Sequence, residues 1–121
     1  MKGHYSAAGT TLAYRDTGAG LPVVLLHPTP LDGEYWHPMI GQFAGIRAIV
    51  PDLRGHGASE LGTDLPVGGF SAVPDVPVLT MNRLAQDIVS LLDHLQVSAA
   101  VFAGCSIGGK QIGKQIGNGR D

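Results

Sequence analysis

Three short apolar runs, each bounded by turn-forming residues, constrain the fold of this chain more than any other feature. They occupy residues 23–26, 46–50 and 99–103. Continuous apolar runs of this length are typical of parallel strands that are buried on both faces. Before the third run, apolar residues recur at helical spacing from 81 to 95. The order of strands and helices predicts an α/β fold, with a mostly parallel sheet, flanking helices and right-handed crossovers.

Further elements are predicted before and between these runs. The first twenty residues alternate around a Gly9-Thr10 turn, which predicts a β-hairpin. A short helix is predicted over 36–43, with Pro38 in its first turn, where a missing N–H does no harm. Residues 54–79 are rich in glycine and proline and predict a loop, and Thr80 is a suitable N-cap for the helix that follows.

Length and composition predict one folded unit. The chain has 121 residues, of which 44% are hydrophobic and 15% charged, a balance typical of a globular domain. Residues 110–121 read KQIGKQIGNGRD and do not match the rest. Glycines at this spacing would each weaken a helix by about 1 kcal/mol relative to alanine. We therefore expect residues 1–109 to form the domain and residues 110–121 to be an atypical tail, frameshifted or disordered.

Charge and cysteine content exclude several classes of protein. The formal net charge is −2, from 8 basic and 10 acidic residues, without the clustered basic surface that nucleic-acid binding needs. The first residues lack the apolar core of a signal peptide, and no apolar run approaches the roughly 18 residues of a membrane span. The single cysteine, Cys105, cannot form an intramolecular disulfide, which favours a reducing compartment. A cytoplasmic protein without metal or cofactor is expected.

A nucleophile motif follows the third apolar run. Residues 104–108 read G-C-S-I-G and match the G-x-S-x-G elbow, which exposes a serine on a sharp turn between strand and helix. The glycines allow the tight turn, and the N–H after the serine can face an oxyanion. The alternative for Ser106 is a turn serine in a protein without catalysis. Cys105 is interpreted as a small buried residue.

Four segments in this order carry a family resemblance: VVLLHPTPLDGEYW, IRAIVPDLRGHGAS, LAQDIVSLLDHL and VFAGCSIGG. Over residues 1–109 they resemble the N-terminal half of the α/β-hydrolase family, of the serine hydrolase or esterase type. The resemblance implies that Ser106 is the nucleophile, that the N–H groups of Thr29 and Ile107 form the oxyanion hole, and that the substrate is a small ester-like molecule. Pro28 lacks an N–H, but the required donor belongs to residue 29.

Other polar residues in these segments have structural interpretations. His27 precedes the nucleophile, against the family's order of serine, acid and histidine, and is interpreted as fixing its loop. Asp52, Arg54 and His56 are expected to organise the loop after the second run. The alternative for Asp52 is a catalytic role, because carboxylates at strand ends serve other α/β enzymes. Trp36 is expected to pack in the core.

A competing interpretation is a nucleotide site. Residues 104–110 read G-x-x-x-x-G-K, as in a P-loop, but Gln111 stands where a Ser or Thr would bind magnesium. Residues 52–55 read D-x-x-G, an element of GTPases, but they precede the loop that they should follow. The sequence therefore disfavours this alternative.

The rest of a catalytic triad is missing after the nucleophile. A serine hydrolase needs a histidine base and a carboxylate to orient it. The five histidines all precede Ser106, and the one acid that follows it is Asp121. Two functions stay open: the N-terminal half of a serine hydrolase that is inactive alone, or a non-catalytic fragment or binding remnant. In either case residues 99–103 would form an unprotected sheet edge, which predicts self-association.

Overall fold

The computed structural model describes residues 1–28, 31–42, 44–62 and 81–104, which contain a five-stranded sheet. The strands are β1 (Lys2–Ala7), β2 (Thr10–Gly18), β3 (Leu21–Leu26), β4 (Ile46–Pro51) and β5 (Val101–Gly104), in the spatial order β1-β2-β4-β3-β5. β4, β3 and β5 run parallel, whereas β2 pairs antiparallel with both β1 and β4. The predicted α/β class is confirmed. The sheet is mixed because the hairpin adds its two strands in the antiparallel sense.

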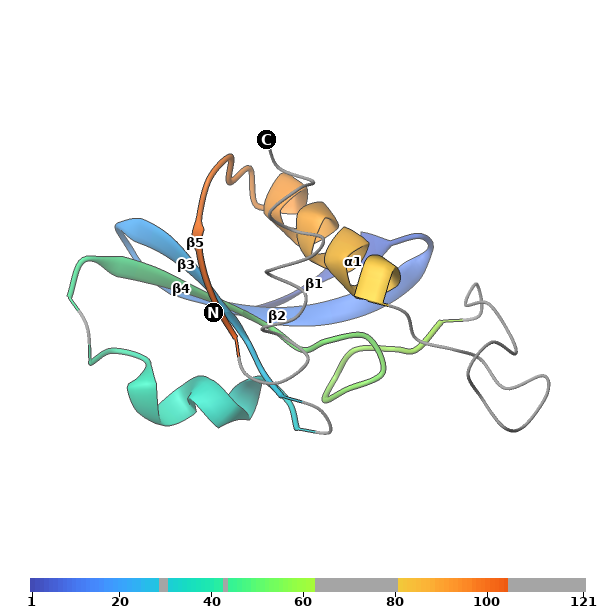
Figure 1. The fold of residues 1–121 in the computed structure, drawn as a ribbon, viewed down its shortest axis with the longest axis horizontal. Coiled ribbons are helices and arrows are strands. Elements are labelled where there is room, and N and C mark those ends of the chain that lie inside the picture. Colours follow the sequence, from blue (N-terminus) through green and yellow to red (C-terminus); the bar gives the residue numbers. More distant parts are fainter. Residues whose placement is uncertain (29–30, 43, 63–80, 105–121) are drawn as a thin grey trace.

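Helices cover both faces of this sheet. The helix α1 (Met81–His94) lies on one face and the 3₁₀ helix η1 (Gly33–Met39) lies on the other (Figure 1). Alternate residues of β3 separate accordingly. Val24 and Leu26 belong to the core cluster that contains α1, and Val23 and Leu25 pack with Trp36 of η1. The prediction of strands buried on both faces is therefore confirmed for β3 and β4, as is the core packing of Trp36. The same prediction is wrong for the third run, because Val101 of β5 is exposed and the residues after it are half-buried.

The hairpin turn lies one residue earlier than predicted. Ala7 pairs with Thr10, which leaves Ala8 and Gly9 as the two turn residues. Both have positive φ angles, 53° and 80°. A two-residue turn with this backbone matches the right-handed twist of its strands, and Gly9 adopts it without steric cost. The predicted Gly9-Thr10 turn is wrong because Thr10 already belongs to β2.

The bounds of two other elements also differ from the prediction. The short helix predicted over 36–43 begins at Gly33, because the Asp32 side chain caps it by accepting a hydrogen bond from the N–H of Glu34 at 2.9 Å. Pro38 consequently lies near the end of η1 and not in its first turn. β5 begins at Val101, two residues after the predicted start, whereas α1 follows the prediction to within one residue. The predicted N-cap Thr80 lies outside the described residues.

Candidate active site

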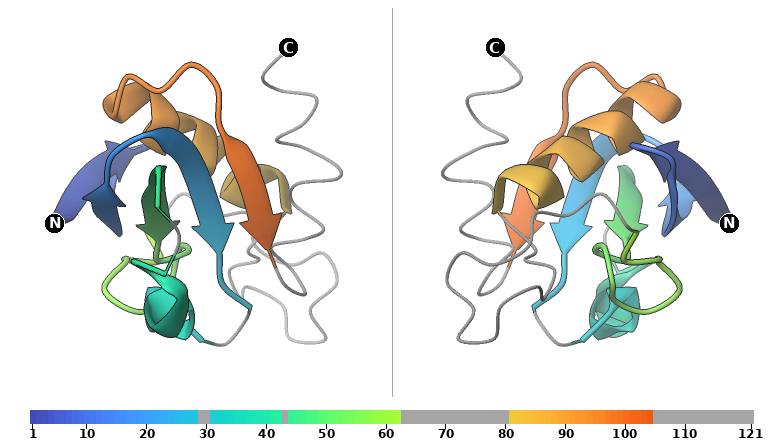
Figure 2. Two further views of the ribbon diagram at one scale, coloured as in Figure 1. Left: turned by 90° about the vertical axis from the view of Figure 1, so that its left-hand side faces the viewer. Right: turned by 90° about the vertical axis from the view of Figure 1, so that its right-hand side faces the viewer.

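The carboxyl ends of β3 and β5 lie side by side (Figure 2). Leu26, the last residue of β3, is in register with Gly104, the last residue of β5. The chain reaches Ser106 two residues after Gly104 and Thr29 three residues after Leu26. Adjacent carboxyl ends of parallel strands are where α/β proteins bind their ligands. Thr29, Ser106 and Ile107 themselves lie outside the described residues, as do residues 63–79 of the predicted loop and residues 110–121.

His27 is buried directly after β3, and both its ring nitrogens have partners. Nε2 accepts a hydrogen bond from the N–H of Leu53 at 2.9 Å, and Nδ1 lies 3.0 Å from the carbonyl oxygen of Pro28. Because a carbonyl only accepts, the proton resides on Nδ1. Burial lowers the pKa of His27 below its ordinary value of 6.5, although the Pro28 carbonyl opposes this. A neutral, fully bonded ring holds a loop in place, as the sequence analysis predicted.

Asp52 accepts hydrogen bonds from two loops. Its Oδ1 accepts from the N–H of Gly33 at 2.8 Å, and its Oδ2 accepts from the N–H of Ala58 at 3.0 Å. Ser59 donates its hydroxyl to the Asp52 carbonyl at 2.6 Å and accepts from the N–H of Ala13 at 2.8 Å. These contacts join β2, the start of η1 and the loop after β4. The predicted structural role of Asp52 is therefore confirmed.

Arg54 forms a buried ion pair that sequence reasoning missed. Its side chain is fully buried and donates from Nε and Nη2 to the two carboxylate oxygens of Asp87, each at 2.8 Å. Nη2 and Nη1 also reach the carbonyls of Ala7 and Leu61, at 3.1 and 3.2 Å. The loop after β4 is thereby fixed to α1 and to the hairpin. The predicted structural role of Arg54 is confirmed, but no local sequence pattern marks its partner 33 residues away.

Two further side chains complete these contacts. Tyr5 of β1 donates its hydroxyl to the backbone carbonyl of Asp87 at 2.9 Å, and burial raises the pKa of Tyr5. The ring of His56 lies with its centroid 5.3 Å from that of His27, and its Nδ1 is 2.9 Å from the carbonyl oxygen of Arg54. His56 therefore helps to organise its own loop, as predicted.

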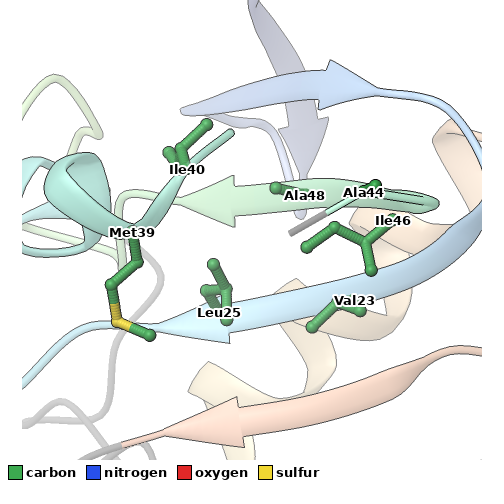
Figure 3. A pocket seen from close by; sticks show the side chains of 7 residues that line it. All are labelled: Val23, Leu25, Met39, Ile40, Ala44, Ile46 and Ala48. Atoms are coloured by element: carbon green, nitrogen blue, oxygen red, sulfur yellow. The ribbon is translucent and has the colours of Figure 1, made fainter. Parts of the chain in front are cut away.

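An apolar pocket of about 350 Å³ lies between the sheet and the end of η1 (Figure 3). Its lining comes from β3, β4 and the segment that joins η1 to β4: Val23, Leu25, Met39, Ile40, Ala44, Ile46 and Ala48. None of these side chains is a nucleophile, an acid or a base. The described lining of the pocket therefore lacks the groups that a hydrolytic site requires.

Metal-binding and membrane-spanning features were sought in the same ranges. Among the described residues, no group of three or more His, Cys, Asp or Glu side chains is arranged to hold a metal ion. The one α-helix in the described part of the chain is too short to cross a membrane.

Comparison with known proteins agrees with this arrangement of strand ends. A sequence profile of the alpha/beta hydrolase family matches residues 23–115, which span β3, β4, α1 and β5. The chain belongs to the α/β-hydrolase family. The matched α/β-hydrolase region includes the G-C-S-I-G motif and the loop that carries Thr29. The predicted family is thus confirmed.

Relatives within the α/β-hydrolase family have names that give different activities. The chain is 34% identical to the non-heme chloroperoxidase of Streptomyces lividans, covering 89% of this chain and 36% of that protein. It is also 34% identical to the epoxide hydrolase of Caballeronia sordidicola, covering 79% of this chain and 26% of that one. Among solved structures, Est816, described as an N-acyl homoserine lactone degrading enzyme, superposes with a TM-score of 0.72 at 36% identity, over 93% of this chain and 40% of Est816. The chain therefore spans well under half the length of these relatives.

Proposed function

We propose that this chain carries the nucleophile half of a serine hydrolase that cleaves an ester or a related acyl bond. Ser106 is the nucleophile, and the N–H groups of Thr29 and Ile107 stabilise the oxyanion. The observation that carries the proposal is the register between Leu26 and Gly104. It brings together the two strand ends from which the chain leads to Thr29 and to Ser106.

The chemistry of a serine nucleophile selects among the activities of the relatives. Attack of the Ser106 hydroxyl on an acyl carbon gives a serine ester, which water can hydrolyse to regenerate the serine. Attack on an epoxide carbon would give a serine ether, which has no comparable route to hydrolysis. A small ester or lactone is therefore the proposed substrate class, consistent with the lactone named for Est816.

The folded unit and its location are part of the same proposal. Residues 1–109 form the hydrolase portion, and residues 110–121 are an atypical tail, although the family match extends to residue 115. A cytoplasmic location is supported by the single cysteine, Cys105. No cofactor is invoked, because acyl transfer through serine needs only a base and an oxyanion hole.

The 121-residue chain alone should show no ester hydrolysis above a Ser106→Ala control. No histidine follows Ser106 in the sequence, and both ring nitrogens of the buried His27 are engaged. A serine without a base stays protonated at neutral pH and is a poor nucleophile. Release of p-nitrophenol from a short-chain ester measures this. Enzyme-like turnover that is lost in Ser106→Ala would show that an upstream histidine, such as His56, acts as base.

The assignment of Ser106 is tested by labelling in an assembled enzyme. The chain is mixed with a polypeptide that supplies the segment of a family relative beyond the matched part, which brings a histidine and a carboxylate. Ser106 should then react with a fluorophosphonate probe, and mass spectrometry should locate the adduct on its peptide. Labelling that persists in Ser106→Ala would contradict the assignment.

A second proposal concerns self-association through β5. In the described part of the chain, β5 pairs only with β3 and is the last strand of the sheet. Residues 101–104 carry neither charge nor proline, and Val101 is 50% exposed. A sheet edge that nothing covers can add a strand from another molecule. The non-catalytic alternative, a binding remnant, would use the same edge.

A further inference from the structure

The loop that leaves β3 is held at both of its ends by two consecutive residues after β4. At its start, the Nε2 atom of His27 accepts from the N–H of Leu53 at 2.9 Å. At its end, the N–H of Gly33 donates to the carboxylate of Asp52 at 2.8 Å. Asp52 and Leu53 are neighbours in the chain, so the two residues directly after β4 contact both ends of this loop. We call this set of contacts, between His27 and Leu53 and between Gly33 and Asp52, the clamp.

The Asp52 end of this clamp is tightly packed. A Cβ atom built on Gly33 would lie 2.9 Å from Oδ1 of Asp52 and 3.1 Å from Cγ1 of Val50, so a side chain does not fit there without displacement. The second carboxylate oxygen, Oδ2, is occupied by the N–H of Ala58. Asp52 can satisfy both amides only as a carboxylate, because the amide group of an asparagine has one accepting oxygen and one donating nitrogen.

The His27 end depends on the protonation state of the ring. Nε2 accepts a hydrogen bond from the Leu53 N–H only when Nε2 carries no proton. In a protonated ring, the N–H at Nε2 would point at the N–H of Leu53, and no hydrogen bond could form. The charged or titratable groups that face His27 are His56, Asp52 and Asp32, of which the two carboxylates favour the charged ring. Burial outweighs them and lowers the pKa of His27.

We infer that His27 and Asp52 are positioning residues that together fix the loop after β3. The inference rests on the proposed function, since this loop carries Thr29, the proposed oxyanion donor. Oxyanion stabilisation requires donors that are already in place when charge develops. A loop tied only at one end would let its amides move, whereas the contacts at His27 and Gly33 restrain both ends.

The histidine makes the clamp sensitive to pH, with a defined sign. The pKa of His27 in the folded protein lies below 6.5, and after opening the ring returns to its ordinary value. As pH falls below about 6.5, the open state binds a proton that the closed state does not, so closure loses free energy. For a group whose pKa in the open state is about 6.5, lowering the pH from about 7.5 to 5.5 favours opening by at most about tenfold.

Residue-resolved hydrogen exchange on the whole 121-residue chain tests this inference. In the unaltered chain, the protection factor of the Leu53 amide should fall between pH 7.5 and 5.5, by at most about tenfold, relative to amides in the centre of β4. His27→Gln replaces the ring by an acceptor that does not titrate, and should remove this pH dependence. His94→Gln, at the exposed end of α1, is the matched control and should keep it.

The Asp52 end is tested in the same measurement. Asp52→Asn should lower the protection of the Gly33 or Ala58 amide at both pH values, because one of these amides loses its acceptor. A Leu53 protection factor that does not change with pH in the unaltered chain, or that changes equally in His27→Gln, would overturn the inference. If His27→Gln does not fold, the pH series on the unaltered chain decides.

This readout separates the inference from the proposed function. Exchange at Leu53 and Gly33 does not involve Ser106, so a failure of fluorophosphonate labelling would contradict the proposed function but not the clamp. In the assembled enzyme, Asp52→Asn should slow labelling of Ser106 by up to about 100-fold, the cost of losing one oxyanion donor. Unchanged labelling together with lost Gly33 and Ala58 protection would show that the clamp exists but does not position the oxyanion loop.

Discussion

Arg54→Met is expected to lower the free energy of unfolding by about 3–5 kcal/mol. The substitution leaves the Asp87 carboxylate, which is 3% exposed, without its bidentate partner in the core. Removing one member of a buried ion pair typically costs about 3–5 kcal/mol, because the remaining charge stays desolvated. Domains of this size have a free energy of unfolding of about 5–15 kcal/mol. Urea denaturation followed by the fluorescence of Trp36 measures the loss.

Two companion variants make this prediction specific. Arg47→Met removes the bidentate pair with Asp16, in which the two side chains are 27% and 10% exposed, and should cost less than Arg54→Met because this pair stays partly hydrated. The double variant Arg54→Met/Asp87→Leu should recover much of the lost stability, because apolar residues often replace a buried pair without penalty. Equal costs for Arg54→Met and Arg47→Met would contradict the anchoring role of Arg54.

The purified chain should sediment as an oligomer or precipitate, and Val101→Lys should shift it to a monomer. Val101 is the first residue of β5, the edge strand of the described sheet, and half of its surface is exposed. A lysine on an edge strand disfavours pairing with a second edge, since its charge would be desolvated. Sedimentation velocity at several concentrations resolves the two states.

Leu21→Lys is the matched control for this edge. Leu21 is 54% exposed and begins β3, which lies between β4 and β5 inside the sheet. The same charge there leaves the β5 edge unchanged, so the oligomer should persist. A monodisperse monomer for the unaltered chain, with a cooperative thermal transition, would show that the β5 edge is protected within the 121 residues.

The sequence predicted the elements whose signals are local. The apolar runs at 23–26 and 46–50 lie within β3 and β4, and the helical spacing over 81–95 agrees with α1. The prediction misplaced η1 because Pro38 is a weaker start signal than the side-chain cap at Asp32. It also began the last strand too early. Ala99 and Ala100 are apolar enough for a strand, but the pairing with β3 begins only at Val101.

The contacts that hold the candidate site together were less predictable. The structural roles of His27, Asp52 and Arg54 followed from their position after strands, but their partners did not. His27 is 26 residues from Leu53, and Arg54 is 33 residues from Asp87. Such pairings depend on strand order, which places β3 between β4 and β5. The pattern of residues in one segment does not show which distant amide or carboxylate its side chains will contact.

The hydrogen bond between Tyr5 and Asp87 has a consequence for synthesis on the ribosome. The two residues are 82 positions apart, so the acceptor of the Tyr5 hydroxyl is made long after the hairpin. At about 5–20 residues per second, the interval is roughly 4–16 s, whereas a hairpin forms in microseconds. During that interval the nascent β1–β2 hairpin holds a tyrosine that has no buried partner. The β1–β2 hairpin is therefore accessible to chaperones and proteases until α1 has been synthesised and can pack on it.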